Sequence, residues 1–279
     1  MAIVTFWSSG KEETAKTLSI AAIATNMAIE HNYKILLLST NYNDDTLETC
    51  FWDPKKTKKR FAALGLHNNV DLDSGMEGLT KAIINKKTSP EVITNYTKII
   101  FKNRLEVLPS AKYAAFDDFK EKLESYKQII SLANQYYDVV MVDLNKGIEN
   151  PYTRDIIEMS DLLIVTISQR MKVIDQTFDM INKEPLLHKK NFMYLVGRYD
   201  KFSKYNSKNI ARYLGLKEEV ATVPYNTLFF EACNEGEAAD FFFKFRKIND
   251  MDRNAVFLKE VKKTTSEIVF RLQNLQMRM

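Results

Sequence analysis

A lysine and a threonine stand side by side in the segment WSSGKEETAKT, residues 7–17, directly after a short apolar run. Gly10 and Lys16 have the spacing of GxxxxGK, and Thr17 follows where such loops carry Ser or Thr. In a phosphate-binding loop, backbone N–H groups at a helix N-terminus face the phosphates, the lysine neutralises charge and the hydroxyl joins the Mg²⁺ shell. These residues predict a phosphate site, although a polar helix start capped by Ser9 or Thr14 would explain the same composition.

A second segment, YDVVMVDLNKGIEN at residues 137–150, ends an apolar run in a carboxylate. Asp143 closes the run and Gly147 follows four residues later. A carboxylate directed at Mg²⁺ and a backbone N–H that senses a γ-phosphate require this arrangement. An ordinary Asp-Gly turn at a strand end explains the segment equally well on its own. Together, the two segments favour a nucleotide site.

The elements that must position these residues alternate along the chain. Near-continuous aliphatic runs predict strands at residues 2–6, 34–38, 104–108, 137–143, 161–167, 191–197 and 219–223. Apolar residues at three- and four-residue spacing predict helices, of which the clearest lie at 14–30, 117–135, 171–183 and 204–214. Such strands are typical of a parallel sheet covered on both faces. We expect a three-layer, doubly wound α/β fold with a mainly parallel sheet and right-handed crossovers.

Composition is that of an ordinary globular protein. The 279 residues are 45% hydrophobic and 27% charged, and no low-complexity linker divides them. We therefore expect a single domain over 1–279, with residues 249–279 as a closing helix. In that helix Val261, Ile268, Leu272 and Leu275 fall near one face. The net charge of +4 selects no partner.

The cysteines and histidines show no paired spacing of a metal site, so we expect no structural metal. Cys50 and Cys233 are interpreted as buried thiols in a reducing compartment. The sequence shows neither a secretory signal pattern nor an apolar run of membrane-spanning length, which predicts a cytoplasmic protein.

Two further segments have both a functional and a structural interpretation. The run DPKKTKKR, residues 53–60, could contact DNA phosphates or anionic lipid, or simply form a solvated loop. The aromatic cluster DFFFKF, residues 240–245, is expected in the core, with a partner-docking surface as the alternative.

Several of these segments resemble the motifs of a known protein family. SSGKEETAKTLSIAAIA is similar to the deviant Walker A motif of the ParA/MinD ATPases, KGGxGKT followed by Thr or Ser. VVMVDLNKGIE resembles their switch II, which is close to DxPAGIE. YKILLLSTNYNDDTL, RLEVLPS, SDLLIVTISQRMKVIDQTFDMI and ATVPYN resemble further family segments in the same order, over roughly residues 1–240. The resemblance implies a P-loop NTPase-like fold, bound ATP or ADP with Mg²⁺, and a homodimer.

Carried over residue by residue, the resemblance implies a role for each matching position. Lys11 matches the signature lysine that reaches the partner's phosphates across a dimer, and with Asp143 it would be catalytic. Thr17 and Asp143 would bind the metal. Residues implied in nucleotide binding are Gly10, Lys11, Thr14, Ala15, Lys16, Thr17, Leu18, Gly147, Arg198, Pro224 and Tyr225.

The departures from the family pattern predict weak or absent hydrolysis. The acidic pair that ends the family's second strand is replaced by Ser39 and Asn41, unless Asp44 or Asp45 substitutes. Glu12 and Glu13 replace two glycines beside the triphosphate, where like charge opposes binding, and Ala15 adds a methyl group. The family's asparagine before Arg198 is Gly197 here, which puts recognition of the base in question.

The leading functional prediction is a ParA/MinD-like protein with a degenerate nucleotide site, a pseudo-ATPase that acts as a spatial-positioning or assembly factor. The pilus-assembly (Tad-type) branch is the nearest functional match, with a protein partner in the assembly and a place in the cytoplasm, at the membrane periphery or at the cell pole. One alternative is an active ATPase for plasmid or chromosome partitioning or septum positioning. Others are a nucleotide-independent interaction module and a metabolic relative, such as an amide ligase or an iron–sulfur reductase.

Overall fold

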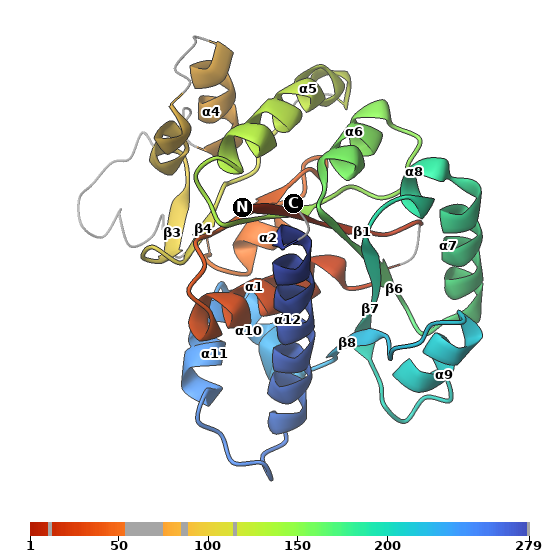
Figure 1. The fold of residues 1–279 in the computed structure, drawn as a ribbon. Coiled ribbons are helices and arrows are strands. Elements are labelled where there is room, and N and C mark those ends of the chain that lie inside the picture. The colour runs from red at the N-terminus through yellow and green to blue at the C-terminus, as the bar shows by residue number, and fades with distance from the viewer. Residues whose placement is uncertain (11–12, 54–74, 85–88, 114–115, 278–279) are drawn as a thin grey trace.

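In a computed structural model of the chain, one eight-stranded sheet organises the molecule (Figure 1). The structure describes residues 1–10, 13–53, 75–84, 89–113 and 116–277, with the side chains of 114–123 excluded. The strands are β1 (Ala2–Trp7), β2 (Ile35–Ser39), β3 (Lys98–Phe101), β4 (Leu105–Val107), β5 (Val139–Asp143), β6 (Leu162–Ile167), β7 (Phe192–Tyr199) and β8 (Ala221–Pro224).

The sheet has the order β3-β4-β2-β5-β1-β6-β7-β8. All neighbours are parallel except β3 and β4, which pair antiparallel. Register in the centre sets Phe6 beside Asp143, so the end of β1 meets the end of β5. The chain order runs in opposite directions on the two sides of β1, and ligands of such sheets bind at the carboxyl ends of strands at this point.

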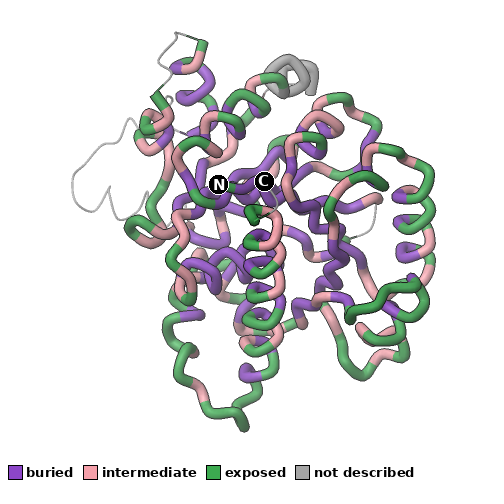
Figure 2. The backbone as a smooth tube through the Cα atoms, in the orientation of Figure 1, coloured by how far each residue is buried: buried purple, intermediate pink, exposed green. Residues whose placement is uncertain are grey.

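Helices cover both faces of the sheet, as three-layer folds require. One face packs against α1 (Lys16–Glu30), α2 (Thr46–Thr49), α10 (Thr227–Glu235), α11 (Ala238–Phe245) and α12 (Ala255–Gln276). The other packs against α4 (Gly75–Ile84), η1 (Pro90–Asn95), α5 (Phe116–Ala133), α6 (Pro151–Met159), α7 (Met171–Lys183), α8 (Pro185–His188) and α9 (Ser207–Tyr213). The buried residues concentrate in the sheet and on the inner helix faces (Figure 2).

The predicted α/β class and mainly parallel sheet are confirmed. Each predicted strand lies within a few residues of an observed one, and the helix predicted at 171–183 matches α7. The closing helix begins at Ala255 rather than at 249, and Val261, Ile268 and Leu272 of its predicted apolar face are buried. Among the described residues, no helix has the length and apolar character needed to cross a lipid bilayer.

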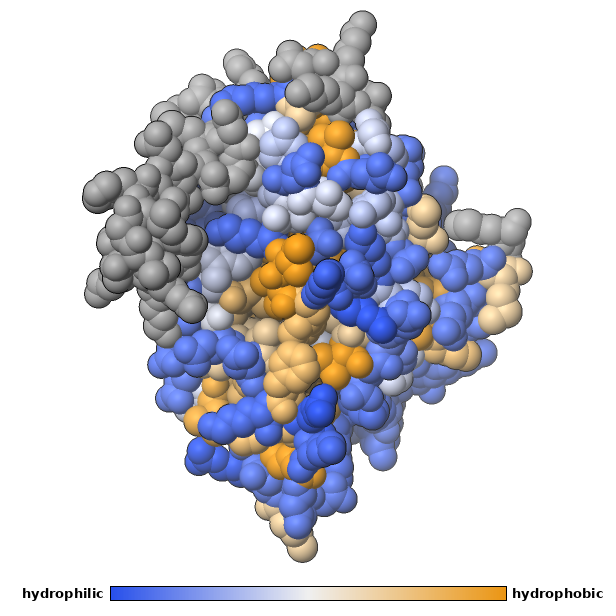
Figure 3. All heavy atoms as spheres, turned by 90° about the vertical axis from the view of Figure 1, so that its left-hand side faces the viewer, coloured by the Kyte–Doolittle hydropathy of each residue, from blue (hydrophilic) through white to orange (hydrophobic). Residues whose placement is uncertain are grey.

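The aromatic cluster at 240–245 is mainly core. Phe241 and Phe242 are buried, whereas Phe243 is 46% exposed and contacts Phe101 of β3 edge to face at 5.1 Å. Ile99 of β3 is 63% exposed. The face that carries β3, α4 and α11 shows a strip of hydrophobic side chains between hydrophilic ones (Figure 3). β3 is therefore a half-exposed edge strand.

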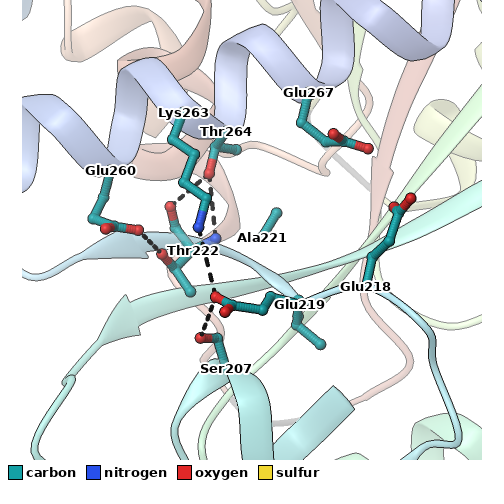
Figure 4. A pocket seen from close by; sticks show the side chains of 10 residues that line it. Ser207, Glu218, Glu219, Ala221, Thr222, Glu260, Lys263, Thr264 and Glu267 are labelled. Carbon is teal, nitrogen blue, oxygen red and sulfur yellow. Dashed lines mark hydrogen bonds and ion pairs between the residues drawn. The ribbon is translucent and has the colours of Figure 1, made fainter.

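The opposite edge, at β8, is covered by α12 (Figure 4). The Thr264 hydroxyl of α12 accepts the N–H of Thr222 at 3.2 Å and donates to its carbonyl oxygen at 2.8 Å. A cavity of about 320 Å³ lies here between α9, β8 and α12. Its four glutamates all have partners: Glu218 and Glu267 bind Arg271, Glu219 binds Lys208 and Lys263, and Glu260 accepts from the Thr222 hydroxyl. Each carboxylate of this acidic cavity is thus engaged in an ion pair or a hydrogen bond.

Cys50 and Cys233 are buried, as predicted, and lie against each other where α2 meets α10. A hydrogen bond to Cys50 and burial raise the pKa of the Cys233 thiol. The Cys233 thiol is therefore a neutral packing group at neutral pH.

Candidate functional site

The start of α1 is built as an anion site. Ala15, the residue before the helix, has left-handed backbone angles (φ 52°, ψ 34°). This conformation costs a residue with a Cβ about 1–2 kcal/mol. No described side chain caps the helix, so neither Ser9 nor Thr14 has the capping role considered from the sequence. The first-turn N–H groups have no acceptor within the helix and carry its positive dipole end.

Lys16 and Thr17 converge on Asp143. The Lys16 ammonium lies 2.8 Å from one Asp143 carboxylate oxygen, and the Thr17 hydroxyl donates to the other at 2.7 Å. Lys16 also donates to the Leu144 carbonyl oxygen. The Lys16 side chain is 6% exposed and that of Asp143 is 0% exposed. Each buried charge is thus balanced by the other, as buried ions require.

The segment after β5 is tied to the loop after β1. Gly147, assigned from the sequence to a γ-phosphate, donates its N–H to the Ser8 carbonyl oxygen at 3.1 Å. The Trp7 indole N–H donates to the Gly147 carbonyl oxygen at 2.6 Å. Gly147 has a φ of +77°, which favours glycine at this turn. A ligand that used this N–H would have to displace Ser8.

The residues at the end of β2 satisfy one another. The backbone N–H and the side-chain amide of Asn41 both donate to the Ser39 hydroxyl, at 3.2 and 3.0 Å. Asp44 accepts from the backbone and hydroxyl of Thr46 at the start of α2. Asp45 pairs with Lys112 at 3.4 Å. Of the two candidate substitutes for the missing acids, Asp44 lines the cleft described next.

A cleft of about 290 Å³ joins these parts. It contains the predicted residues Thr14, Ala15, Lys16, Thr17, Leu18 and Arg198. It also contains residues that the sequence did not indicate: Ser8, Lys146, Thr46, Phe230 and Asn234. The Ser8 hydroxyl oxygen is buried and has no hydrogen-bond partner among the described residues. Lys146 lies in the sequence between Asp143 and Gly147, so its position could have been predicted. Phe230 and Asn234 lie on α10, a helix that the sequence did not predict.

Gly197 lets the phosphate loop approach β7. A Cβ at this position would lie 2.0 Å from the Thr14 carbonyl oxygen. The next residue, Arg198, has a left-handed φ of 50° and pairs with Glu13 at 3.3 Å. Glu13 is 78% exposed, so this ion pair is worth only about 0–1 kcal/mol. The glycine that replaces the expected asparagine is thus required by packing.

Pro224 and Tyr225 line a second cavity, of about 450 Å³, at the ends of β7 and β8. Asp200, Lys201 and Arg253 are further members of its lining. Gly10 is described, and a Cβ there would meet open space. Lys11, Glu12 and the basic residues Lys55, Lys56, Lys58, Lys59 and Arg60 lie outside the described residues.

The residues fit a magnesium nucleotide in several respects. Lys16, the left-handed Ala15 and the unpartnered Ser8 hydroxyl form a cradle suited to phosphate oxygens. Thr17 and Asp143 are the hydroxyl and carboxylate that Mg²⁺ accepts beside waters and phosphates. No cluster of three or more His, Cys, Asp or Glu side chains that could hold a metal ion occurs among the described residues.

Neither the protein-family models nor the sequences of curated proteins match this chain. Solved structures match most of its length. A ParA family ATPase from Chlorobium tepidum has a TM-score of 0.67 at 14% identity, covering 96% of this chain and 98% of that one. MinD in the MinC:MinD complex of Aquifex aeolicus has a TM-score of 0.65 at 18% sequence identity, and the match covers 96% of each chain. MinD from Pyrococcus horikoshii, solved with Mg-ADP, has a TM-score of 0.64 at 14% sequence identity, and the match covers 96% of this chain and 97% of that one. At such identities the likeness concerns the fold, and this chain has the P-loop NTPase fold of the ParA and MinD ATPases.

Proposed function

We propose that this protein binds a magnesium nucleotide at the start of α1, hydrolyses it weakly or not at all, and acts as a positioning or assembly factor. The observation that carries the proposal is the joint arrangement of Lys16, Thr17 and Asp143 at an uncapped helix start. Left-handed backbone at Ala15 is costly, and a phosphate cradle supplies the reason to keep it.

Binding is supported by charge as well as by geometry. The N-terminal dipole of α1, the Lys16 ammonium and the nearby side chains of Lys146 and Arg198 attract phosphate. Glu13 opposes it, and its ion pair with Arg198 at the cleft rim offsets part of the attraction from that arginine. We therefore expect binding that is weakened rather than lost.

Weak hydrolysis is supported by the end of β2. Phosphoryl transfer needs a group that positions the attacking water and charges that stabilise the transition state. Ser39 and Asn41 bond to each other, and Asp44 is occupied by Thr46. Lys11 and Asp143 would be the catalytic residues in any residual turnover.

The proposed role follows the structures with the same fold. The relatives include a MinD in complex with MinC, and we propose by analogy a homodimer with a protein partner in a positioning or assembly system, such as pilus or secretion machinery. DNA or a membrane surface is an alternative binding partner for the basic run at 53–60.

The test is a titration with ATP and Mg²⁺, followed by thermal denaturation, molecular mass and phosphate release. We expect a raised melting temperature, since a ligand that binds only the folded state stabilises it, and little phosphate release. The double variant Glu12→Gly, Glu13→Gly should bind nucleotide more tightly, and Glu91→Gly with Glu158→Gly, two exposed acids outside the cleft lining, is the control for the loss of two charges. Unchanged affinity in the loop variant would contradict the electrostatic argument.

An active ATPase is the second candidate, favoured by the intact contact between Thr17 and Asp143. In that case phosphate release would be fast, and Thr17→Ala, which leaves the buried ion pair in place, would abolish it. A nucleotide-independent interaction module would instead give no thermal shift with any nucleotide.

A further inference from the structure

The largest cavity described above adjoins the phosphate cleft and could take the base of a nucleotide held at the start of α1. Tyr199 ends β7 and Pro224 ends β8, and both line it. β7 is two strands from β1, which is about 10 Å at ordinary strand spacing. Tyr225 of this cavity and Phe230 of the phosphate cleft have ring centroids 6.3 Å apart, so the two spaces share a wall.

We propose that this pocket selects guanine over adenine, an inference that rests on the proposed nucleotide binding. Its charged lining consists of two carboxylates, Asp200 and Glu260, and two cations, Lys201 and Arg253. Of the carboxylates, Glu260 already accepts from the Thr222 hydroxyl, so Asp200 is the one proposed to contact the base. Carboxylates only accept hydrogen bonds, and Lys and Arg only donate them. Guanine offers both complements: a ring N–H beside an amino group for a carboxylate, and O6 with N7 for Arg or Lys. Adenine offers one amino group and acceptor nitrogens.

The amide groups that would read adenine are absent or engaged in the described lining. An Asn or Gln amide pairs with the amino group and N7 of adenine. Asn226 is in the lining, but its side-chain oxygen accepts the Phe229 N–H at 2.8 Å and its NH₂ donates to Asn254 at 2.8 Å. Gly197 has no side chain, and the Thr14 carbonyl fills the space where one would begin.

Asp200 is held in place by Gln169. The Gln169 side chain accepts the Asp200 N–H at 2.7 Å and donates to the carbonyl oxygens of Asp200 and Tyr205 at 2.9 and 2.8 Å. One Asp200 carboxylate oxygen accepts the Phe202 N–H at 2.9 Å, which fixes the side chain against its own loop. A rigid backbone with a carboxylate at the cavity is what selective recognition of a base requires.

The test compares dissociation constants of GTP, ATP and xanthosine triphosphate, each with Mg²⁺, by calorimetry. We expect GTP to bind the wild-type chain at least about ten-fold more tightly than ATP, the factor that one lost hydrogen bond to a charged group produces. Asp200→Asn should weaken GTP binding about ten-fold or more and leave ATP within about two-fold. The same variant should gain affinity for xanthosine triphosphate, whose C2 carbonyl accepts from the new amide, and a merely structural role would not produce this exchange.

Asp179→Asn, an exposed carboxylate on α7, is the matched control and should change none of these constants. Arg253→Ala should weaken GTP more than ATP. Equal or tighter binding of ATP by the wild-type chain would overturn the guanine inference and leave the proposed nucleotide binding standing. No binding of any of the three nucleotides would overturn both.

Discussion

At the scale of single residues, the site is held by charges that satisfy each other. Lys16 and Asp143 are an almost fully buried ion pair, and the Thr17 hydroxyl donates to the carboxylate oxygen that does not face Lys16. Such a pair adds little net stability when complete, but either half alone is a buried uncompensated charge. The phosphate lysine is therefore also part of the fold's internal charge balance.

Replacing Lys16 by Ala should lower the free energy of unfolding by about 3–5 kcal/mol, because the Asp143 carboxyl group would be left in a fully buried site without its partner. Urea denaturation measures the change, and Lys189→Ala, an exposed lysine, is the control. Lys16→Ala combined with Asp143→Ala should recover part of the loss. Simple addition of the two single effects would contradict the coupling.

Lys16, Thr17 and Asp143 could be predicted because short spacings carry them. That they lie together was implied only by the resemblance, because the contacts join residues 126 or more positions apart and no local spacing indicates them. Ser8 could not be predicted from the sequence, because it stands out only by a buried hydroxyl without a hydrogen-bond partner, which the structure alone shows. From the sequence, Gly197 was interpreted as the loss of an asparagine that would contact the base. The structure shows that the Thr14 carbonyl oxygen leaves no room for a side chain at this position.

At the scale of elements, the buried strands were the predictable part. Their apolar runs reflect burial on both faces of the sheet. β3 was missed because its KIIF run is short and half exposed. The helices α6, α10 and α11 were missed as well, and each has nine residues or fewer, although α9, with seven residues, was predicted. Short helices take their stability from packing on neighbours, which the local sequence does not record.

The contact between the phosphate loop and β7 leads to a prediction at this scale. Gly197→Ala should push Thr14 away, because the new Cβ would lie 2.0 Å from its carbonyl oxygen. We expect destabilisation of about 1–3 kcal/mol from overpacking, together with weaker nucleotide binding. Gly10→Ala, whose Cβ would meet open space, is the matched stability control for adding a methyl group in the same region. Equal losses of stability in the two variants, measured by thermal denaturation, would contradict the packing argument.

At the scale of the whole molecule, one buried acid should make stability depend on pH. Glu48 of α2 is 9% exposed and accepts the Ser110 N–H at 2.6 Å. Burial raises the pKa of this carboxyl from 4.5 to about 7, although the hydrogen bond from Ser110 opposes the rise. Between these values the unfolded chain releases its proton while the folded chain retains it.

The contribution of Glu48 to the free energy of unfolding therefore falls as pH rises from about 4.5 to 7, and it is constant outside this window. Glu48→Gln should remove this slope and raise the free energy of unfolding above pH 7 by up to about 3 kcal/mol. Denaturant titrations at pH 5 and pH 8 measure it, and Glu231→Gln, with an exposed side chain, is the control. A variant equally more stable at both pH values would refute the assignment.

The two hydroxyl hydrogen bonds of Thr264 also limit how copies of this chain could associate. A strand that joins a sheet needs free N–H and C=O groups, and at β8 those of Thr222 are already used by α12. Only β3 is left as an edge in the described sheet. A molecule with one free edge strand can pair edge to edge with a second copy through that strand. The resulting dimer has no further free edge strand to which a third copy could add. Association through strands would thus end at two copies instead of extending into a filament.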